Sequence, residues 1–376
     1  MLVVLIGSAA GLAYVYLGYS LLLRAMACCF GRRPLNSDPP RLSVTVLITV
    51  HNEQERIAAR IENVLACDFD SGQLKIVVAS DGSTDQTEEI ARNYADRGVG
   101  VFRPNQRVGK SGTQNGALAL ISTDIVVFTD ADTRFSPSFL TEIIRPFSEA
   151  QVGCVGGQLF FSNDDLIGDI AFAQGRYWAQ ELAVRRAESD LGMLAVVSGA
   201  CMAIRRNLVK PLPAAIGEDC VVPLDVCRQN FQVRHAPLAI AFDRGARTAT
   251  EEFQSRVRMT LRNWQGTWLY ADLLNPLRHP RIALGLWSHK ILRWLSPFML
   301  IGFWLASVAL VFSRSPSRLL GLPGVVMLLA CAFASLLPPC RRLPGLRSLW
   351  PFLVANSGFA LGVARGIAGQ QIITYR

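Results

Sequence analysis

An uncharged apolar run at the N-terminus constrains the fold of this chain more than any other feature. Met1 to Leu23 contains no charged residue, and Arg24, Arg32 and Arg33 follow it. About 20 apolar residues in an α-helix cross the hydrocarbon core of a bilayer, and basic flanks favour the cytoplasmic side. We therefore expect a transmembrane helix over residues 1–27. The alternative is a cleavable signal peptide, which is disfavoured because no charge precedes the apolar run.

Three more apolar stretches lie near the C-terminus: Trp294 to Ser313, Leu319 to Cys340 and Ser348 to Ala364. We expect three further spans, which together form a C-terminal membrane region of residues 294–370. The last stretch is the weakest candidate because it is short and contains Asn356. A mean hydropathy of +0.28 with 18% charged residues agrees with a soluble domain joined to membrane helices.

The arginines between these stretches bear on orientation. Arg314 and Arg318 separate the first two, whereas three arginines lie in the loop of residues 341–347. With the N-terminus outside, the 341–347 loop lies inside and is the more basic by one residue, which agrees with the positive-inside rule. We expect an integral membrane protein, of the bacterial plasma membrane, whose central domain is cytoplasmic.

Charge and cysteine content narrow the possible partners. The 38 basic residues, only four of them lysines, give a net charge of +9. Without zinc-finger spacing, an RNA-binding motif or a basic repeat, this excess favours membrane lipids and phosphate groups over nucleic acid. The nine cysteines include no Cys-x-x-Cys pair, so neither a zinc site nor a disulfide framework is indicated.

Residues 42–270 form a block of ordinary domain size in which apolar runs typical of strands alternate with helical patterns. The clearest strands are Val44–Ile48, Ile76–Ala79 and Ile125–Phe128, each followed by a polar turn. Such alternation predicts an α/β domain with a Rossmann-like, mostly parallel mixed sheet, flanked by the transmembrane helices. The loops after the three strands should then meet at one edge of the sheet.

Residues 271–293 mix basic and apolar side chains just before the first C-terminal stretch. Arg278, Arg281, Lys290 and Arg293 alternate with leucine, isoleucine and tryptophan. This pattern favours an amphipathic segment at the lipid headgroup boundary, with an ordinary surface helix as the alternative.

The triplet Asp130-Ala131-Asp132 ends the third strand. Two carboxylates at the C-terminal end of a buried strand direct oxygen ligands into the crevice where open α/β sheets bind ligands. Such a pair can hold a divalent cation and, through it, a diphosphate. The alternative is a solvated turn, since short acidic triplets are common.

An ordered set of motifs resembles family 2 glycosyltransferases. Its members, in chain order, are His51-Asn52-Glu53, Ser80 to Asp85, Gly109-Lys110 with Asn115, Asp130-Ala131-Asp132, Gly217-Glu218-Asp219 and Arg258 to Gly266. Together with the membrane helices, the set is similar to the membrane-bound cellulose, chitin, hyaluronan and poly-N-acetylglucosamine synthases. The resemblance implies the glycosyltransferase-A fold and a nucleotide-sugar donor.

For the donor half, the resemblance implies a role for each motif. His51, Asn52 and Glu53 belong to the donor-binding side, and Asp81 is expected to recognise uracil or ribose. Its alternative is a cap on the helix that starts near Thr84. Lys110 suits the diphosphate, with a solvated loop lysine as the alternative.

The same resemblance assigns the metal to the aspartate triplet. Asp132 is expected to bind Mg²⁺ or Mn²⁺, and Asp130 to contact the ribose or support the metal shell.

For the acceptor half, Asp219 aligns with the catalytic base of an inverting transfer, and Glu218 with a supporting role. The alternative for the pair is a helix N-cap. Gly199 is a candidate acceptor contact.

The chain departs from the Gln-x-x-Arg-Trp motif of processive members. Arg262 keeps the arginine position, Met259 replaces the glutamine, and Trp264 is displaced by one residue. Arg262 is expected to stabilise the leaving group. Trp264 is expected either to stack on the acceptor or to pack at the membrane interface.

These observations predict a membrane-anchored, metal-dependent, inverting glycosyltransferase. The expected donor is a UDP-sugar, and the expected acceptor is a lipid-linked saccharide or a glycan in surface polysaccharide or glycolipid synthesis. Two alternatives remain. One is a processive polysaccharide synthase, and the other is a non-catalytic subunit that works with polysaccharide-assembly partner proteins.

Overall fold

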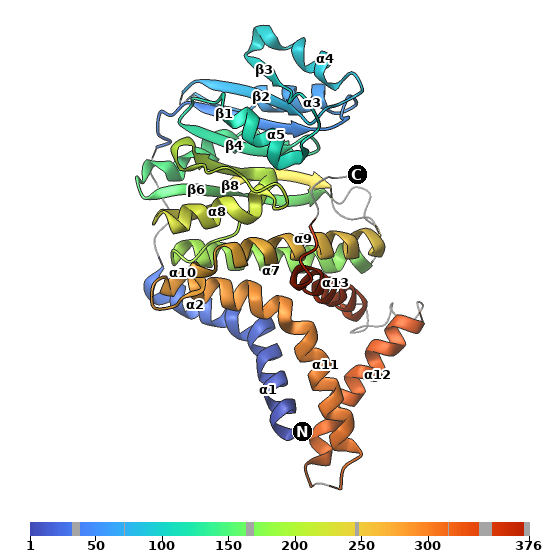
Figure 1. Ribbon diagram of the computed structural model, residues 1–376. Helices are drawn as coiled ribbons and strands as arrows, with labels where there is room; N and C mark the ends of the chain where they lie inside the picture. Colours follow the sequence, from blue (N-terminus) through green and yellow to red (C-terminus); the bar gives the residue numbers. More distant parts are fainter. Residues whose placement is uncertain are drawn as a thin grey trace.

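The computed structural model describes residues 1–31, 38–70, 72–162, 169–244, 248–314, 316–337 and 348–371. Its central domain is built on one eight-stranded sheet, with strand order β3-β2-β1-β4-β7-β6-β8-β5 (Figure 1). The strands are β1 (Val44–Val50), β2 (Leu74–Ser80), β3 (Val99–Phe102), β4 (Ile125–Asp130), β5 (Arg134–Phe135), β6 (Val152–Ser162), β7 (Met202–Arg205) and β8 (Gln232–Arg244). The predicted mostly parallel mixed sheet is therefore present.

One half of the sheet is parallel. Strand β1 lies between β2 and β4, both parallel to it, and β3 extends the same half. Three helices connect these strands, α3 (Ile57–Leu65), α4 (Thr87–Arg92) and α5 (Gly109–Leu118), whereas α6 (Phe139–Ile144) packs on β6 and β8. The core of β1 and β4 is almost fully buried, as expected for apolar strands covered on both faces. The carboxyl ends of β1, β2 and β4 consequently open at one edge.

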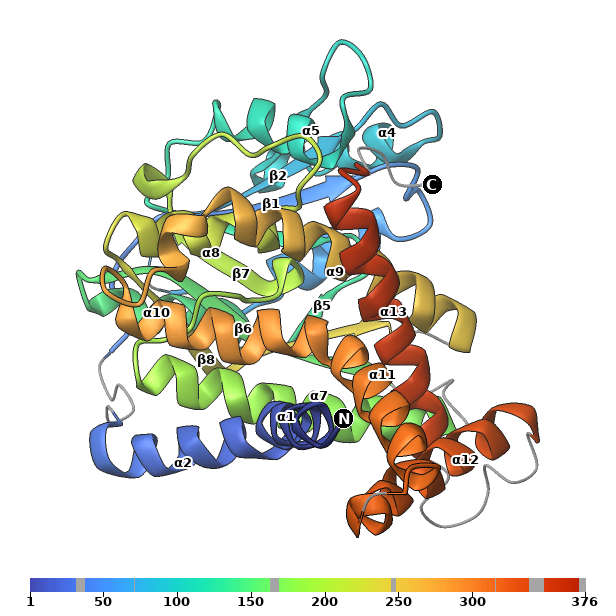
Figure 2. The ribbon, with the colours of Figure 1, turned by 60° about the horizontal axis from the view of Figure 1, so that its bottom comes forward.

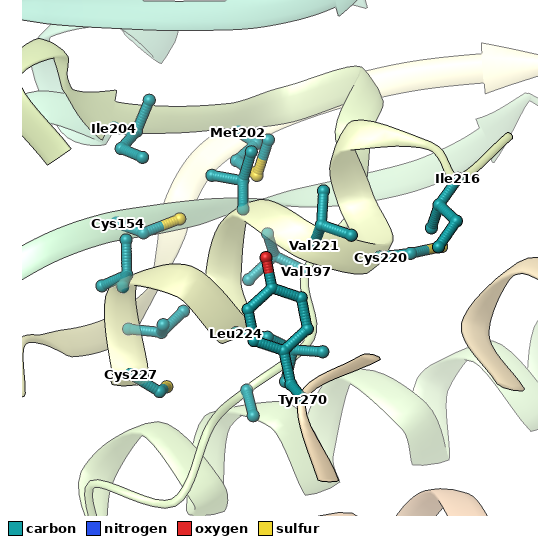
Figure 3. Close-up of a cluster of buried hydrophobic side chains, with 14 of the residues drawn as sticks. Cys154, Val197, Met202, Ile204, Ile216, Cys220, Val221, Leu224, Cys227 and Tyr270 are labelled. Carbon is teal, nitrogen blue, oxygen red and sulfur yellow. The ribbon is translucent and has the colours of Figure 1, made fainter. Parts of the chain in front are cut away.

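The other half is mixed. Strand β7 runs antiparallel to both β4 and β6, whereas β6 and β8 are parallel. Helix α8 (Glu218–Arg228) packs on this half: its Cys220, Val221 and Leu224 belong to the same buried apolar cluster as Met202 of β7, and Val221 lies toward Met202 (Figure 3). This apolar face fixes where the acidic N-terminus of α8 lies.

Two long helices cover the underside of the domain, α7 (Asp169–Asp190) and α9 (Ala249–Leu269) (Figure 1). Thr248 caps α9, because its side chain accepts a hydrogen bond from the backbone N–H of Glu251. From the same side the membrane helices descend.

Three helical stretches are long and apolar enough to cross a membrane: Leu2–Phe30, Pro280–Val311 and Pro316–Leu336. The first comprises α1 (Leu2–Ala13), a π-helical turn (Tyr14–Gly18) and α2 (Tyr19–Phe30). The second comprises α10 (Pro280–Gly285), a π-helical turn (Leu286–Ile291) and α11 (Leu292–Val311), and the third contains α12 (Leu322–Leu336). Their existence agrees with three of the predicted spans.

The first two stretches are bent. Figure 2 shows α1 end-on while α2 lies across the view, and α10 likewise lies flat beneath the domain before α11 turns away. In α11 the bend has a local cause. Pro297 lacks the N–H that would bond the carbonyl of Arg293, and the Ser296 hydroxyl donates to that carbonyl instead at 2.7 Å.

The fourth predicted span forms α13 (Leu349–Ile367), which is not among the three membrane-length stretches within the described chain. It packs along α9 instead. A Cβ built on Gly358, Gly362 or Gly366 would come within 2.6 Å of a side-chain atom of α9. Side chains of α9 therefore pack directly against the backbone of α13 at these three glycines. The arginines used to predict orientation, Arg32 and Arg33 and the three of the 341–347 loop, lie outside the described residues.

The predicted interfacial segment 271–293 forms helical turns beneath the domain, but two of its basic residues do not face lipid. Lys290 and Arg293 both pair with Glu181 of α7, at 3.4 and 2.9 Å. Arg278 and Arg281 are exposed, as expected. The prediction was wrong for Lys290 and Arg293 because a buried carboxylate on α7, distant in sequence, attracts them.

Candidate active site

The loops that follow β1, β2 and β4 meet at the carboxyl edge of the sheet. His51 Nδ1 lies 3.0 Å from the backbone oxygen of Asp81, and the backbone N–H of Asp81 donates to the oxygen of Val50 at 2.9 Å. The predicted convergence of the first two motifs is therefore present as direct contacts.

Asp81 organises the start of α5. Its Oδ1 accepts hydrogen bonds from the backbone N–H groups of Val108 and Gly109 and from the Thr113 hydroxyl, at 2.9, 3.0 and 3.0 Å. Gly109 has φ of +79°, a left-handed conformation that allows both amides to point at one oxygen. The alternative of a cap near Thr84 was wrong, because Asp81 anchors the N-terminus of a helix 28 residues further on.

Asn52 and Glu53 connect the β1 and β2 loops. Asn52 has φ of +56°, and its Oδ1 accepts a hydrogen bond from the backbone N–H of Thr84 at 2.8 Å. The backbone N–H of Glu53 donates to the Thr87 hydroxyl at 2.8 Å. These two candidate donor residues therefore shape the loop in this structure.

Lys110 joins the two halves of the site. Its Nζ lies 2.7 Å from Asp130 Oδ1 and 2.8 Å from Glu218 Oε1. The lysine side chain is 19% exposed, so it is not the solvated loop residue that was the alternative. Because Asp81 holds the first turn of α5, it also holds Lys110 between these carboxylates.

The aspartate triplet lies at the rim of the site. Asp130 is 36% exposed and Asp132 is also exposed, so both are accessible to a divalent cation. Within the described chain no three His, Cys, Asp or Glu side chains are grouped closely enough for an all-protein cage. A donor set of two carboxylates suits Mg²⁺ or Mn²⁺ when phosphate and water oxygens complete the shell, so these residues fit the expected metal.

The acidic pair occupies the first turn of α8. Gly217 is the N-cap residue and no side chain caps it, so the N-cap alternative for Glu218 and Asp219 was wrong. Negative charge in a first turn is favoured by the helix dipole. Gly199, from a 3₁₀ turn before β7, lies directly against them, since a Cβ there would meet Glu218 Oε1 at 2.9 Å.

Asp219 is half-buried, and its surroundings favour the neutral form. Burial, followed by the charge of Glu218, raises the pKa of Asp219 above its ordinary value, although Lys110 and Arg262 oppose this. A carboxylate whose pKa is raised binds a proton more readily. This residue can therefore accept a proton at the centre of the site.

Arg262 and Trp264 lie on different sides of α9. Gly266 brings α9 against α8, because a Cβ there would meet the Cys220 carbonyl at 2.8 Å, and Arg262 faces Gly217 and Asp219. Trp264 is 9% exposed and lies edge-on to Trp294, with ring centroids 6.2 Å apart. Trp264 therefore packs between helices, and its face is not available for stacking on a sugar.

The positioning contacts of Asn115, which belongs to the motif set, and of Ser111, which sequence reasoning missed, were not predicted. Asn115 bonds the backbone of Leu212 in both directions, at 2.9 and 2.8 Å, and the Ser111 hydroxyl donates to the carbonyl of Ile216. Helix α5 thereby holds the loop that precedes α8. No local pattern signals these contacts, because about 100 residues separate the partners.

Buried Arg60 supports the aspartate triplet from below. Its Nη2 donates to the Thr129 hydroxyl at 2.8 Å, and that hydroxyl donates to the carbonyl of Ala200. The residue before Asp130 is thus tied to the turn that contains Gly199. Arginine in an amphipathic helix gives no sequence signal for such a role.

Comparison with known proteins identifies the motif-bearing segment. Residues 45–212 match the family described as Glycosyl transferase family 2. An N-acetylglucosaminyltransferase of Azorhizobium caulinodans is 25% identical over 217 residues, covering 54% of each chain. A poly-beta-1,6-N-acetyl-D-glucosamine synthase of Staphylococcus aureus is 24% identical over 224 residues, covering 57% of this chain and 53% of the synthase. The chain thus spans about half the length of these relatives.

A solved structure extends the likeness to the membrane helices. The mannosyltransferase PcManGT from Pyrobaculum calidifontis, in complex with GDP-Man and Mn²⁺, superposes with a TM-score of 0.70 at 20% identity. The match covers 98% of this chain and 100% of that one. The similarity establishes a shared fold, so the predicted glycosyltransferase-A fold with flanking apolar helices is confirmed.

Proposed function

We propose that this chain, whose residues 45–212 match the glycosyl transferase family 2 model, is a membrane-anchored, metal-dependent, inverting glycosyltransferase. It moves a sugar from a nucleotide-sugar donor, a UDP-sugar, to a lipid-linked or glycan acceptor. The product belongs to surface polysaccharide or glycolipid synthesis. The domain works at the cytoplasmic face of a bacterial plasma membrane.

One observation carries the proposal: Lys110 contacts Asp130 and Glu218 at 2.7 and 2.8 Å. Asp130 belongs to the donor half and Glu218 precedes the candidate base Asp219. Transfer requires a diphosphate site and a proton acceptor within the reach of one sugar ring. A single side chain spans that gap here.

Charge at the site favours an incoming cation and diphosphate. Asp130, Asp132, Glu218 and Asp219 carry more negative charge than Lys110 and Arg262 neutralise. Bound to Asp130 and Asp132, Mg²⁺ or Mn²⁺ would supply the positive charge that neutralises the diphosphate. Lys110 is then positioned to turn from Asp130 to a phosphate oxygen.

The transfer step assigns one task to each residue. Asp219 accepts the proton of the acceptor hydroxyl while the oxygen of that hydroxyl forms a bond to the anomeric carbon. The bond from that carbon to the diphosphate oxygen breaks on the opposite face, and the nucleoside diphosphate leaves with the electron pair. Lys110 and Arg262 stabilise the charge that develops on it.

A processive synthase is the second candidate, because the Staphylococcus aureus relative is a poly-beta-1,6-N-acetyl-D-glucosamine synthase. Two features disfavour it. Trp264 is buried between helices, and three membrane-length helical stretches are found in the described chain, fewer than a polymer channel ordinarily needs without partner proteins. Product length on a gel separates single transfer from polymerisation. A non-catalytic subunit is disfavoured by its intact acidic motifs.

The test uses the full chain in nanodiscs, with UDP- and GDP-sugars offered with and without Mn²⁺. We expect metal-dependent release of a nucleoside diphosphate from a UDP-sugar and a thermal shift with UDP and Mn²⁺ together. Release from GDP-mannose alone would overturn the choice of nucleotide. Failure of every nucleotide to shift the melting temperature, with no turnover, would overturn the transferase itself.

A further inference from the structure

The first apolar helix is longer than a bilayer requires. Leu2–Phe30 is a continuous helix of 29 residues, which at 1.5 Å per residue is about 43 Å long. The hydrocarbon core is about 30 Å thick. The α1 helix and the π-helical turn that follows it, 12 and 5 residues, together provide about 25 Å. Their combined length is at the lower limit of about 17 residues for a helix that crosses the core, so most of α2 is not needed for crossing.

The bend separates α2 from α1. In Figures 1 and 2, α1 points away from the domain, whereas α2 runs along its underside next to α7. Tyr19 and Leu23 of α2 are buried against Val184 and Leu191 of α7. In addition, the Tyr19 hydroxyl donates to Glu188 at 2.7 Å. One face of α2 is therefore fixed to the catalytic domain.

The opposite face of α2 is apolar and exposed. Leu21 is 62% exposed, and Ala25 and Cys28 continue the same stripe. An exposed stripe of this kind, next to helices that enter the membrane, is covered by lipid rather than water.

Arg24 decides the depth of this face. It is exposed and lies on the same side of α2 as Leu21 and Cys28, being three and four residues from them. An arginine at the bilayer centre costs about 2.5 to 3.5 kcal/mol on insertion scales, but at the headgroup level its guanidinium binds lipid phosphate. The stripe therefore fits the boundary between headgroups and chains.

A cavity lies beside the end of α2, on the face of this helix that packs against the domain. It has a volume of about 280 Å³ and is lined by Met26, Phe30, Asp190, Leu191, Met193 and Arg281. Arg281 is exposed beside apolar walls, the combination that suits a phosphate headgroup above an acyl chain.

We propose that α2 lies in the plane of the membrane, at the headgroup level of the leaflet nearest the catalytic domain. Only Leu2–Gly18 crosses the hydrocarbon. The apolar stripe of Leu21, Ala25 and Cys28 contacts acyl chains, while Arg24 and Arg281 contact lipid phosphates. The catalytic domain is thereby held against the surface by a helix of its own, independently of any sugar it transfers.

Depth measurements on the full chain in nanodiscs of phosphatidylglycerol and phosphatidylcholine test this. Nitroxide labels are placed at Leu21→Cys, at Leu305→Cys on the exposed face of α11, and at Leu120→Cys on the domain surface. Cys28, Cys29 and Cys340 are changed to serine, while the other cysteines are buried. The depth of each label in the membrane is measured from its collision rates with oxygen and with a nickel chelate. We expect the label at position 21 to be shallower than the label at position 305 and deeper than the label at position 120.

A second probe avoids altering the stripe. With Cys29→Ser and Cys340→Ser, the native thiol of Cys28 takes an environment-sensitive dye, which headgroup-placed quenchers should quench more than chain-end quenchers. A Leu21 label as deep as Leu305, or a Cys28 dye quenched most at the chain ends, would mean that α2 crosses the bilayer. A Leu21 label as water-accessible as Leu120 would mean that α2 does not touch lipid. Either result overturns the proposal.

Discussion

Two clusters of charged residues differ in how completely they are neutralised. At the sheet edge, Asp130 and Asp132 are exposed and Asp219 is half-buried. On the underside, Glu181 is 3% exposed and is contacted by Arg185, His289 and Arg293 at 3.0, 2.9 and 2.9 Å. In the first cluster, negative charge that nearby basic groups do not neutralise faces the solvent. In the second cluster, the buried carboxylate is surrounded by basic side chains and is not accessible to a ligand. Exposure and incomplete pairing, rather than clustering, distinguish a reactive site from a structural one.

The buried cluster connects the membrane helices to the domain. His289 places Nδ1 and Nε2 2.9 Å from Glu188 and Glu181, so an imidazolium would donate to both carboxylates. Although burial acts to raise it, the basic side chains around Glu181, including Lys290 and Arg185, hold the pKa of Glu181 well below its ordinary value. This network clamps α2 and the π-helical turn before α11 to α7.

The largest effect is expected from Asp219→Asn, which changes the exposed cluster at the sheet edge. We expect a loss of transfer of about 10²- to 10⁴-fold, because the amide accepts no proton from the acceptor. Since the folded protein raises the pKa of Asp219, the ionised form costs stability above that pKa, and the asparagine variant should melt no lower than wild type at neutral pH. Rates and melting curves on the same nanodisc preparation check both. Unchanged turnover would remove the base role.

Asp132→Ala should cost about 10³-fold in transfer, since a cation on a transferring diphosphate contributes several kcal/mol. The exposed side chain makes no packing contribution, so folding should be unaffected. Mn²⁺ titration of activity is the measurement, with Asp96→Ala, another exposed aspartate, as the control. Equal metal dependence in both variants would contradict the assignment.

Glu181→Gln should instead affect stability. It leaves Arg185 and Arg293 buried without their carboxylate, at a cost of about 3 to 5 kcal/mol in unfolding free energy. Transfer below the melting temperature should fall only a few-fold. Glu62→Gln, whose partner Arg97 is half exposed, is the control and should leave the unfolding free energy almost unchanged, because exposed ion pairs are screened by solvent. A similar loss of unfolding free energy in both variants would show that burial of the ion pair does not determine its contribution to stability.

The pH profile gives a smaller effect. Because the deprotonated form of Asp219 is the active one, kcat/KM should rise tenfold per pH unit below its folded pKa and level off above it. The midpoint should lie above the ordinary value for aspartate. A midpoint at or below that value, or the same acid limb in Asp219→Asn, would show that another group controls the profile.

Gly362→Ala should produce the smallest change. The new methyl group would meet Thr260 on α9 at 2.6 Å, and overpacking of this kind costs about 1 to 3 kcal/mol. Gly7→Ala on α1 is the control, because nothing lies within 4 Å of a Cβ there. Thermal unfolding in nanodiscs compares them, and equal melting temperatures would contradict the close contact.

The parallel half of the sheet was predictable because its strands are uninterrupted apolar runs that end in polar motifs. The strands expected from Val44, Ile76 and Ile125 onward lie within β1, β2 and β4. From the parallel arrangement it followed that the motifs after these strands would meet, and the contacts of Asp81 and Lys110 show that they do.

What could not be predicted depends on partners distant in sequence. An uncharged run such as Met1 to Leu23 gives no sign of a bend, because the bend comes from packing of α2 on α7. Lys290 and Arg293 fit a lipid-facing pattern equally well until Glu181 is known to lie opposite. Trp264 fitted either of two roles, and only the positions of α11 and α13 decided between them.

The three glycines along α13 have a mechanical consequence. At four-residue intervals they remove every side chain that would hold α13 away from α9, so no lipid or water layer separates the two helices. Thr260 touches Gly362 only two residues before Arg262. A shift of α13 would therefore displace α9 as well, and with it the guanidinium beside Asp219, so the last described helix and the candidate reaction centre are mechanically coupled.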